Sequence, residues 1–333
     1  MKIICSILLT LPFVNLYAQP TPRATAHLFY MRSVGSLVLI DGYENGTTPA
    51  SGKAETWEWK SNNWSKLDET NQQMRSLSAA VYITNRDQLF IYGGVGSRGY
   101  DDSLKQAYVY DGKIWSAVPN NQLGTRDHHE MAWDENNNAV VLYGGQTASR
   151  EFDTRTWLFK DGKWTALTIS GPGARVHHAM AYDAERKKIV LFGGSGNDQS
   201  FDETWEFDGK LWSKIETPIN PGKRTHHAMV YDAVRKKVLL YGGVVGMDLQ
   251  NDVWAWDGKS WEKLSSNGPA RILPAIAFNP SDEKIYVFGG NGGQQMMSIY
   301  SDLWTWDGKD WSQVYRGKEY RFDMGQSKFV EVK

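Results

Sequence analysis

The pattern of hydrophobic and polar positions repeats along the chain, and residues 175–215 show one unit clearly. Residues 175–183 alternate in the manner of a strand, and a short apolar run at 189–192 ends at Gly193-Gly194. After a polar loop, residues 204–207 and 211–215 form two further apolar segments around Asp208-Gly209. Short strands bounded by turn residues are typical of antiparallel sheets. The unit is therefore predicted to be a blade of four antiparallel strands.

The same unit occurs six times, in the order arginine, double glycine and two aromatic residues. The glycine pair follows 18 residues after the arginine, and the two aromatics are seven residues apart. The arginines are Arg23, Arg75, Arg126, Arg175, Arg224 and Arg271; the pairs are Asp41-Gly42 (a degenerate copy), Gly93-Gly94, Gly144-Gly145, Gly193-Gly194, Gly242-Gly243 and Gly289-Gly290; the aromatics are Trp57/Trp64, Tyr108/Trp115, Trp157/Trp164, Trp205/Trp212, Trp254/Trp261 and Trp304/Trp311. A period of about 49 residues predicts a solenoid, propeller or array.

The Asp-Gly step between the last two strands predicts a tight hairpin. If Asp208-Gly209 is the centre of a two-residue turn, Trp205 lies directly opposite Trp212, and this explains their spacing of seven. In the third unit the step is shifted by one residue, so a three-residue turn with Gly162 in the left-handed region is expected there.

These residues resemble the kelch-repeat β-propeller family, which includes the central domain of galactose oxidase. The resemblance covers about residues 21–315 and implies an all-β, six-bladed kelch-type propeller. The blades are expected at about residues 21–70, 71–121, 122–170, 171–219, 220–267 and 268–315, with a tail at 316–333 that closes the ring or pairs with a blade edge. The galactose oxidase copper site uses a tyrosine cross-linked to cysteine. The single cysteine, Cys5, lies in the first 18 residues, so that site and any other cofactor are not expected.

The resemblance also implies a ligand face. In this family the first strand of each blade lines the central channel, and the loops before it and after the double glycine share one face. Three blades break the repeat there, with His128, His177 and His226 two residues after the arginine. They are weak candidates for a metal site, candidates for ligand contact, or residues inherited through duplication.

The other candidates for ligand contact are Arg75, Arg126, Arg175, Arg224 and Arg271, together with loop residues of the longer loops. These loop residues are Tyr43, Arg98, Tyr100, Gln294 and Tyr300. The alternative for the arginines is structural, since each could pair with an acid of a neighbouring blade or with carbonyls.

Residues 1–18 resemble a secretory signal peptide, with Lys2, a short apolar stretch and a small residue, Ala18, at the expected cleavage point. They predict a secreted or periplasmic protein. The formal charge of −1 provides no basic face for nucleic acid. No later run is apolar for long enough to predict membrane insertion.

Two functions remain open from the sequence. The first is an exported monomer that binds an extracellular protein or glycan through the face with the histidines and variable loops. The alternative is a small-molecule enzyme, resembling a sugar mutarotase, epimerase or lyase, in which an arginine holds a carboxylate and a histidine transfers a proton. Catalysis predicts a closed pocket with a histidine and a carboxylate within hydrogen-bond reach, whereas binding predicts an open rim with aromatic residues.

Overall fold

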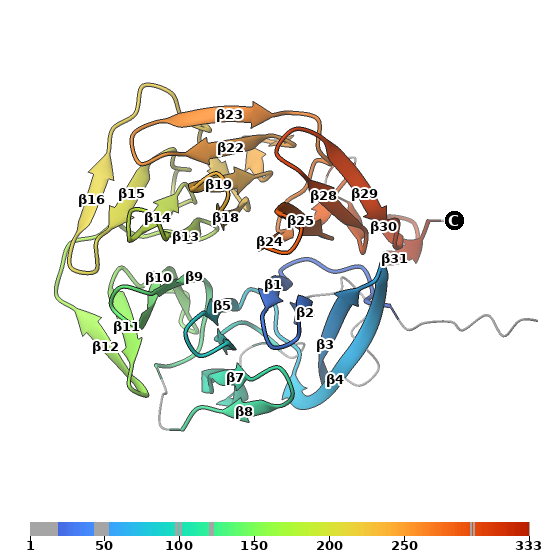
Figure 1. The fold of residues 1–333 in the computed structure, drawn as a ribbon, viewed down its shortest axis with the longest axis horizontal. Coiled ribbons are helices and arrows are strands. Elements are labelled where there is room, and N and C mark those ends of the chain that lie inside the picture. The colour runs from blue at the N-terminus through green and yellow to red at the C-terminus, as the bar shows by residue number, and fades with distance from the viewer. Residues whose placement is uncertain are drawn as a thin grey trace, which may run out of the picture.

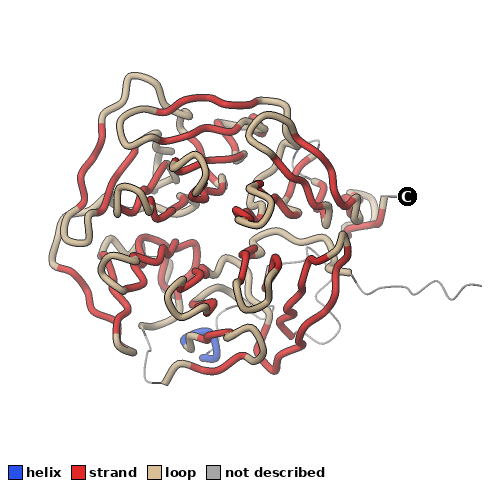
Figure 2. The backbone as a smooth tube through the Cα atoms, in the orientation of Figure 1, coloured by secondary structure: helices blue, strands red, loops and turns tan. Residues whose placement is uncertain are grey.

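The fold is a β-propeller, in which twisted sheets surround a central axis (Figure 1). The computed structural model describes residues 19–42, 53–96, 99, 102–119, 123–293, 295 and 297–332. Strands make up nearly all of the regular structure, and the helix in the described part is one short 3₁₀ turn, η1 (Asp102–Lys105) (Figure 2). The all-β prediction is confirmed.

Six sheets carry the six sequence repeats, and we call each of them a blade. Within a blade, four strands pair in chain order from the axis outward, although two short strands of another sheet intervene in the chain in the fifth and the sixth blade. The blades comprise β1 (His27–Met31), β2 (Ser36–Ile40), β3 (Lys53–Lys60) and β4 (Asn63–Gln73); β5 (Ala79–Ile83), β6 (Gln88–Tyr92), β7 (Tyr108–Tyr110) and β8 (Trp115–Ala117); β9 (Arg126–Asp134), β10 (Ala139–Thr147), β11 (Thr156–Lys160) and β12 (Lys163–Leu167); β13 (Ala179–Asp183), β14 (Lys188–Phe192), β15 (Thr204–Phe207) and β16 (Trp212–Ile215); β18 (Ala228–Asp232), β19 (Lys237–Tyr241), β22 (Val253–Trp256) and β23 (Trp261–Ser265); and β24 (Ala275–Asn279), β25 (Lys284–Phe288), β28 (Leu303–Trp306) and β29 (Trp311–Tyr315).

Two small sheets extend the loops that follow the double glycines. One contains β17 (Arg224–Thr225), β20 (Val244–Val245) and β21 (Asp248–Leu249). The other contains β26 (Asn291–Gly292), β27 (Ser298–Tyr300), β30 (Glu319–Asp323) and β31 (Lys328–Glu331). The tail therefore forms a hairpin that pairs with β27, which lies in the loop after Gly289-Gly290, and not with the outer strand of a blade.

The blades are joined by one hydrogen bond that recurs at every junction. The amide of the second residue of each glycine pair donates to the carbonyl of the next blade's arginine, as in Gly94 N to Arg126 O at 2.7 Å. The sixth blade reaches the first in the same way, because Gly290 N donates to Arg23 O at 3.0 Å. The first strands contact one another in a closed cycle, from β1 through β5, β9, β13, β18 and β24 back to β1. The ring is thus closed without any exchange of strands between blades.

The double glycines are needed because the neighbouring blade approaches so closely. Gly93 has a φ of +72°, and a Cβ at this position would lie 2.5 Å from the His129 ring and 2.7 Å from the Arg126 carbonyl oxygen. His178 and His227 lie against Gly144 and Gly193 in the same manner. The second histidine of each pair is therefore a packing residue of the blade junction.

The predicted hairpin register is wrong, and the structure explains the aromatic pairs differently. Trp212 lies opposite Phe207, while Trp205 lies opposite Lys214. The turn has four residues instead of two, because Asp208 Oδ1 accepts hydrogen bonds from the amides of Lys210 and Leu211, both at 2.8 Å. An aspartate that caps its own turn in this way competes with the two-residue geometry.

In the third blade the turn is shorter than predicted. Lys160 pairs with Lys163, so Asp161 and Gly162 form a two-residue turn, and both have positive φ. Tryptophans of the outermost strands form hydrogen bonds between neighbouring blades. The Trp212 indole donates to Thr156 Oγ1 in the preceding blade at 2.8 Å, and Trp261 donates to Thr204 Oγ1 at 2.8 Å.

Candidate ligand-binding cavity

The six arginines are buried inside the blades. None is more than 7% exposed, and five form an ion pair with a carboxylate of their own blade. These pairs are Arg23–Glu55, Arg126–Asp153, Arg175–Glu203, Arg224–Asp252 and Arg271–Asp302, at 2.8–3.1 Å. In the second blade, Arg75 donates to the carbonyls of Gly93 and Gln106, both at 3.1 Å.

In the five blades with these ion pairs, the first tryptophan of the aromatic pair donates a hydrogen bond to the same carboxylate. For example, Trp254 Nε1 donates to Asp252 Oδ2 at 2.7 Å, next to the bidentate contact from Arg224. Charge-assisted contacts of this kind fix the geometry of a blade. The structure therefore places Arg75, Arg126, Arg175, Arg224 and Arg271 in the framework rather than on a ligand surface, which favours the structural alternative.

A ring of six residues narrows one end of the central channel. Each blade contributes the residue two positions after its arginine: Thr25, Leu77, His128, His177, His226 and Leu273. All six have a φ between 52° and 59°, a left-handed conformation that costs a non-glycine residue roughly 1–2 kcal/mol. Backbone hydrogen bonds link neighbouring members, including His226 N to His177 O at 3.0 Å and Thr25 N to Leu273 O at 3.2 Å.

The three histidines that break the repeat meet within this ring. The imidazoles of His177 and His226 stack with centroids 3.8 Å apart, and His128 contacts His177 edge-on at 4.5 Å. Burial lowers the pKa of His177 to about 2 and that of His226 to about 4, and the neighbouring imidazoles add to the effect. Stacked rings present their faces and not their nitrogens to one another. In the described residues no group of histidine, cysteine and acid side chains is arranged to hold a metal ion.

A cavity of about 670 Å³ runs along the axis from this ring to the opposite face of the propeller. Its far end is bordered by the residues that follow the first strands: Arg32, Thr84, Glu135, Ala184, Ala233 and Pro280. Five of these are exposed, so the mouth lies at this end. The sequence prediction favours the histidine face, whereas the exposed residues that border the cavity lie at the opposite end.

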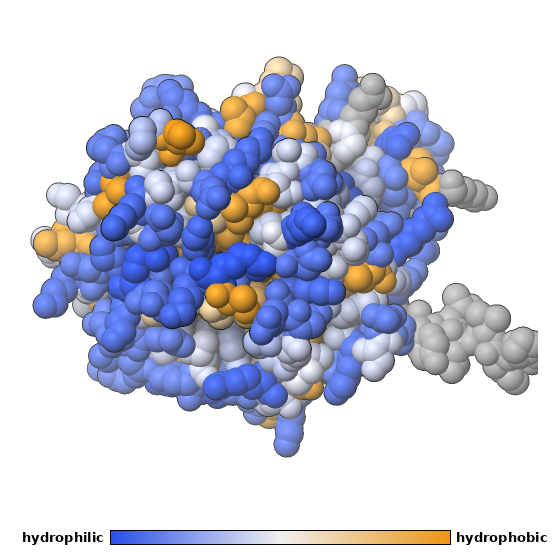
Figure 3. Space-filling view, turned by 45° about the horizontal axis from the view of Figure 1, so that its top comes forward, coloured by the Kyte–Doolittle hydropathy of each residue, from blue (hydrophilic) through white to orange (hydrophobic). Residues whose placement is uncertain are grey.

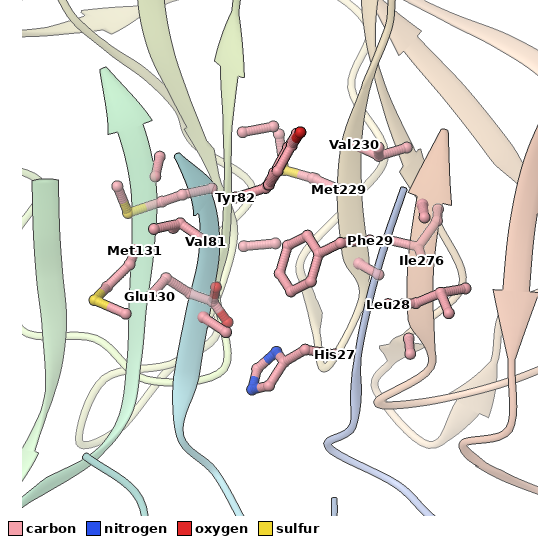
Figure 4. A pocket seen from close by; sticks show the side chains of 18 of the residues that line it. His27, Leu28, Phe29, Val81, Tyr82, Glu130, Met131, Met229, Val230 and Ile276 are labelled. Carbon is pink, nitrogen blue, oxygen red and sulfur yellow. The ribbon is translucent and has the colours of Figure 1, made fainter. Parts of the chain in front are cut away.

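The cavity wall is mainly apolar, with two ionisable side chains in its deep part. His27 from β1 and Glu130 from β9 reach toward one another between apolar residues such as Val81, Met229 and Ile276 (Figure 4). Four of the blades have alanine at this position, namely Ala79, Ala179, Ala228 and Ala275. Sequence reasoning missed both residues, although comparing the six repeats column by column would have singled them out.

Burial in the cavity favours the neutral form of both side chains. Burial lowers the pKa of His27 to about 4, although a hydrogen bond with Ser78 opposes the shift; its Nε2 lies 3.1 Å from Ser78 Oγ. Burial alone raises the pKa of Glu130 to about 8. Ionisable groups with strongly shifted pKa values in a cavity are typical of functional sites.

Residues 113–269 match the family model described as the KLHDC2/KLHL20/DRC7 Kelch-repeats domain. This part of the chain therefore carries kelch repeats. The match spans the third, fourth and fifth blades, which have the double histidines, and no curated protein matches the sequence. Kelch repeats indicate a protein-interaction propeller. No helix in the described residues is long and apolar enough to span a membrane, as the sequence predicts.

Aromatic residues from all six blades line the cavity between Glu130 and the mouth. They are Tyr30, Tyr82, Trp133, Tyr182, Tyr231 and Phe278. Several tyrosine hydroxyls also bond to the turn of the preceding blade, as in Ser281 Oγ to Tyr30 at 2.8 Å and Asn136 N to Tyr182 at 3.2 Å. These bonds fix the rings in place, so the wall is rigid. The side of the molecule seen in Figure 3 is largely hydrophilic, with separate hydrophobic patches.

The predicted loop residues contribute little to the described cavity. Tyr43, Arg98, Tyr100 and Gln294 lie outside the described residues. Tyr300 is in β27, where its ring lies 3.7 Å from the Arg271 guanidinium and covers it. Tyr300 is thus part of the shield around a buried arginine.

Proposed function

We propose that this chain is an exported kelch-repeat binding protein that recognises a protein partner through the mouth of its central cavity. Export rests on the signal-like residues 1–18. Binding of a protein rests on the kelch repeats and, above all, on one observation: a rigid cavity of about 670 Å³ with an apolar, aromatic wall opens to solvent. Cavities of this size and composition are typical of ligand sites.

A protein segment suits this wall better than a glycan does. A sugar carries hydroxyl groups on most of its carbons, and each would lose water on entering the cavity. Without partners, buried hydroxyls cost free energy. Apolar protein side chains gain from the same transfer. The partner is therefore expected to insert one or two large side chains past the aromatic residues.

The geometry gives less support to the enzyme. The arginines that the enzyme hypothesis assigns to a substrate carboxylate are buried and bond to groups of their own blades. His27 and Glu130 come from different blades, and the His27 ring is paired with Ser78. No hydrogen bond joins these two side chains in the described structure; the histidine–carboxylate contact at the cavity is instead His128 Nδ1 with Asp127 Oδ1 at 2.8 Å, in the ring where the three imidazoles pack against one another.

Selection from a random peptide library on purified protein tests the proposal. The affinity of the enriched peptides is then measured for two variants on opposite faces. Val230→Phe fills the cavity beside the mouth, whereas Met247→Asp changes a residue that is 90% exposed on the histidine face. We expect Val230→Phe to weaken binding about tenfold or more and Met247→Asp to leave it unchanged. The reverse result would move the site to the face that the sequence favours, and a library without enriched peptides would count against a protein partner.

A further inference from the structure

Glu130 is an acid with no structural role apparent in its surroundings. It occupies a position where four other blades have alanine, so the fold does not require a carboxyl group there. Its side chain is partly exposed to the cavity, and apolar residues surround it (Figure 4). A buried carboxyl without a partner destabilises the folded state. An unpaired carboxyl group in such a place points to a ligand.

The cavity around Glu130 suits a long ligand with one polar end. Glu130 lies on β9 five residues before Glu135 at the mouth, which puts it roughly 16 Å deep. Beyond it lies the ring in which His177 and His226 stack and His128 contacts His177 edge-on. A ligand that enters from the mouth therefore passes the aromatic residues and the apolar wall before its end reaches the carboxyl.

The charges in the cavity favour a cation at that end. Among the described lining residues, Arg32 is the side chain with a fixed positive charge, and it lies at the mouth, where it donates to the Tyr82 hydroxyl at 3.3 Å. The path toward Glu130 thus has no cation to repel an incoming one. Aromatic faces along the path attract organic cations.

We propose that Glu130 anchors a primary ammonium group carried on an unbranched apolar chain, the chemistry shared by a lysine side chain and a free aliphatic amine. This deepens the proposed function, because the ammonium would be the group that a partner inserts. The chain contacts the apolar wall, and the ammonium and the carboxylate neutralise one another at the deep end. Burying either charge without the other would be unfavourable.

Binding of the cation requires Glu130 to lose its proton. The carboxyl is largely protonated at pH 7 in the free protein, since burial raises its pKa to about 8, whereas an aliphatic ammonium keeps its proton up to about pH 10. One proton is therefore released to solvent for each ligand bound below pH 8. The affinity is expected to rise about tenfold per pH unit up to that point and then to level off.

The effect of Glu130 must be separated from that of the other titratable groups that line the cavity. They are His27 and Tyr30 on β1, Arg32 and Glu135 at the mouth, Tyr82 on β5, His128 and His129 on β9, His177, His178 and Tyr182 of the fourth blade, and His226, His227 and Tyr231 of the fifth. The pKa values of His27 and His177 are lowered to about 4 and 2, and that of Tyr182 is raised to about 12, so these three do not titrate between pH 6 and 9. The variant Glu130→Gln removes the proton of Glu130 and leaves all the others.

The test compares matched ligands by isothermal titration calorimetry between pH 6 and 9. One arm uses n-hexylamine and n-hexanol; the other uses a selected peptide with lysine and the same peptide with that lysine acetylated. The wild type is expected to prefer the charged member by about tenfold or more, and Glu130→Gln to abolish both the preference and the pH slope. Glu130→Ala introduces the alanine that four other blades have at this position, so it is compatible with the fold. It should behave like Glu130→Gln, and this agreement would exclude misfolding as the cause.

The outcomes distinguish a lysine of a partner from a free amine, and they distinguish this inference from the proposed function. Preference in the peptide arm identifies lysine of a partner, and preference in the hexylamine arm alone identifies a free amine. Equal binding of hexylamine and hexanol together with equal binding of both peptides would overturn the inference, as would a pH slope that persists in Glu130→Gln. If peptides bind through the mouth, with sensitivity to Val230→Phe but not to lysine acetylation, the proposed function stands and this inference fails.

Discussion

Replacing Asp153 by asparagine should expose how much the buried arginine clusters stabilise the propeller. The Asp153 side chain is 3% exposed and accepts hydrogen bonds from Arg126 Nη2 at 3.1 Å, from Arg155 Nε at 2.8 Å and from Trp157 Nε1 at 2.9 Å. Asparagine keeps the shape but removes the charge. Breaking a buried pair on one side leaves the other charge uncompensated and costs about 3–5 kcal/mol of unfolding free energy.

The pH dependence of this cost follows from the pKa of Asp153. Burial opposes ionisation, but the hydrogen bonds from Arg155 and Trp157 and the charge of Arg126 outweigh it and lower the pKa from 3.8 to about 2. A lowered carboxyl pKa stabilises the folded state above the unfolded value, and that contribution disappears as the pH falls from about 4 to about 2. The shift corresponds to about 2.5 kcal/mol at pH 7.

Urea unfolding followed by tryptophan fluorescence at pH 7, 4 and 3 measures the effect. Asp198→Asn, on an exposed loop of the next blade, is the matched control and should change the unfolding free energy by less than about 0.5 kcal/mol. We expect the difference between wild type and Asp153→Asn to narrow as the pH decreases below 4. A loss below about 1 kcal/mol at pH 7, or one that stays constant down to pH 3, would refute this reasoning.

Two further changes test the blade junction and the cavity. Gly93→Ala should destabilise the fold by several kcal/mol more than Gly35→Ala, since both glycines have a φ near +70° but only Gly93 faces a neighbour within 4 Å; equal losses in urea unfolding would show that backbone strain alone matters. The lowered pKa of His27 makes the unfolding free energy of the wild type fall by about 1.4 kcal/mol per pH unit from pH 6.5 to 4. His27→Gln should therefore lose less stability than the wild type when the pH is lowered over this range. Parallel stability curves for the two proteins would contradict this.

The repeated order of the motifs could be predicted from the sequence, but the contacts of individual side chains that set local geometry could not. Six arginines at a constant distance from a double glycine predict a propeller because the same junction recurs in every blade. The hairpin register was missed because it depends on one carboxylate: Asp208 caps its own turn and lengthens it.

The candidate site was harder to predict, because the motifs draw attention to framework residues. Arg126 and Trp157 are prominent in the pattern, yet they serve Asp153 inside the blade. Glu130 and His27 lie at a position that belongs to no motif, and only their departure from alanine marks them. Whether a side chain faces the channel depends on how neighbouring blades twist against one another, which a single repeat does not reveal.

The junction between the last blade and the first has a consequence for how such a ring can change. The contact from Gly290 to Arg23 is the same bond that joins every other pair of blades, although the chain does not continue across it. The ring therefore has no privileged starting point. New termini placed between any two blades would leave each blade whole. Duplication of one unit would add a blade that has both the glycine amide and the arginine carbonyl needed to bond to its two neighbours. Each blade is therefore a unit of gene duplication as well as a unit of structure.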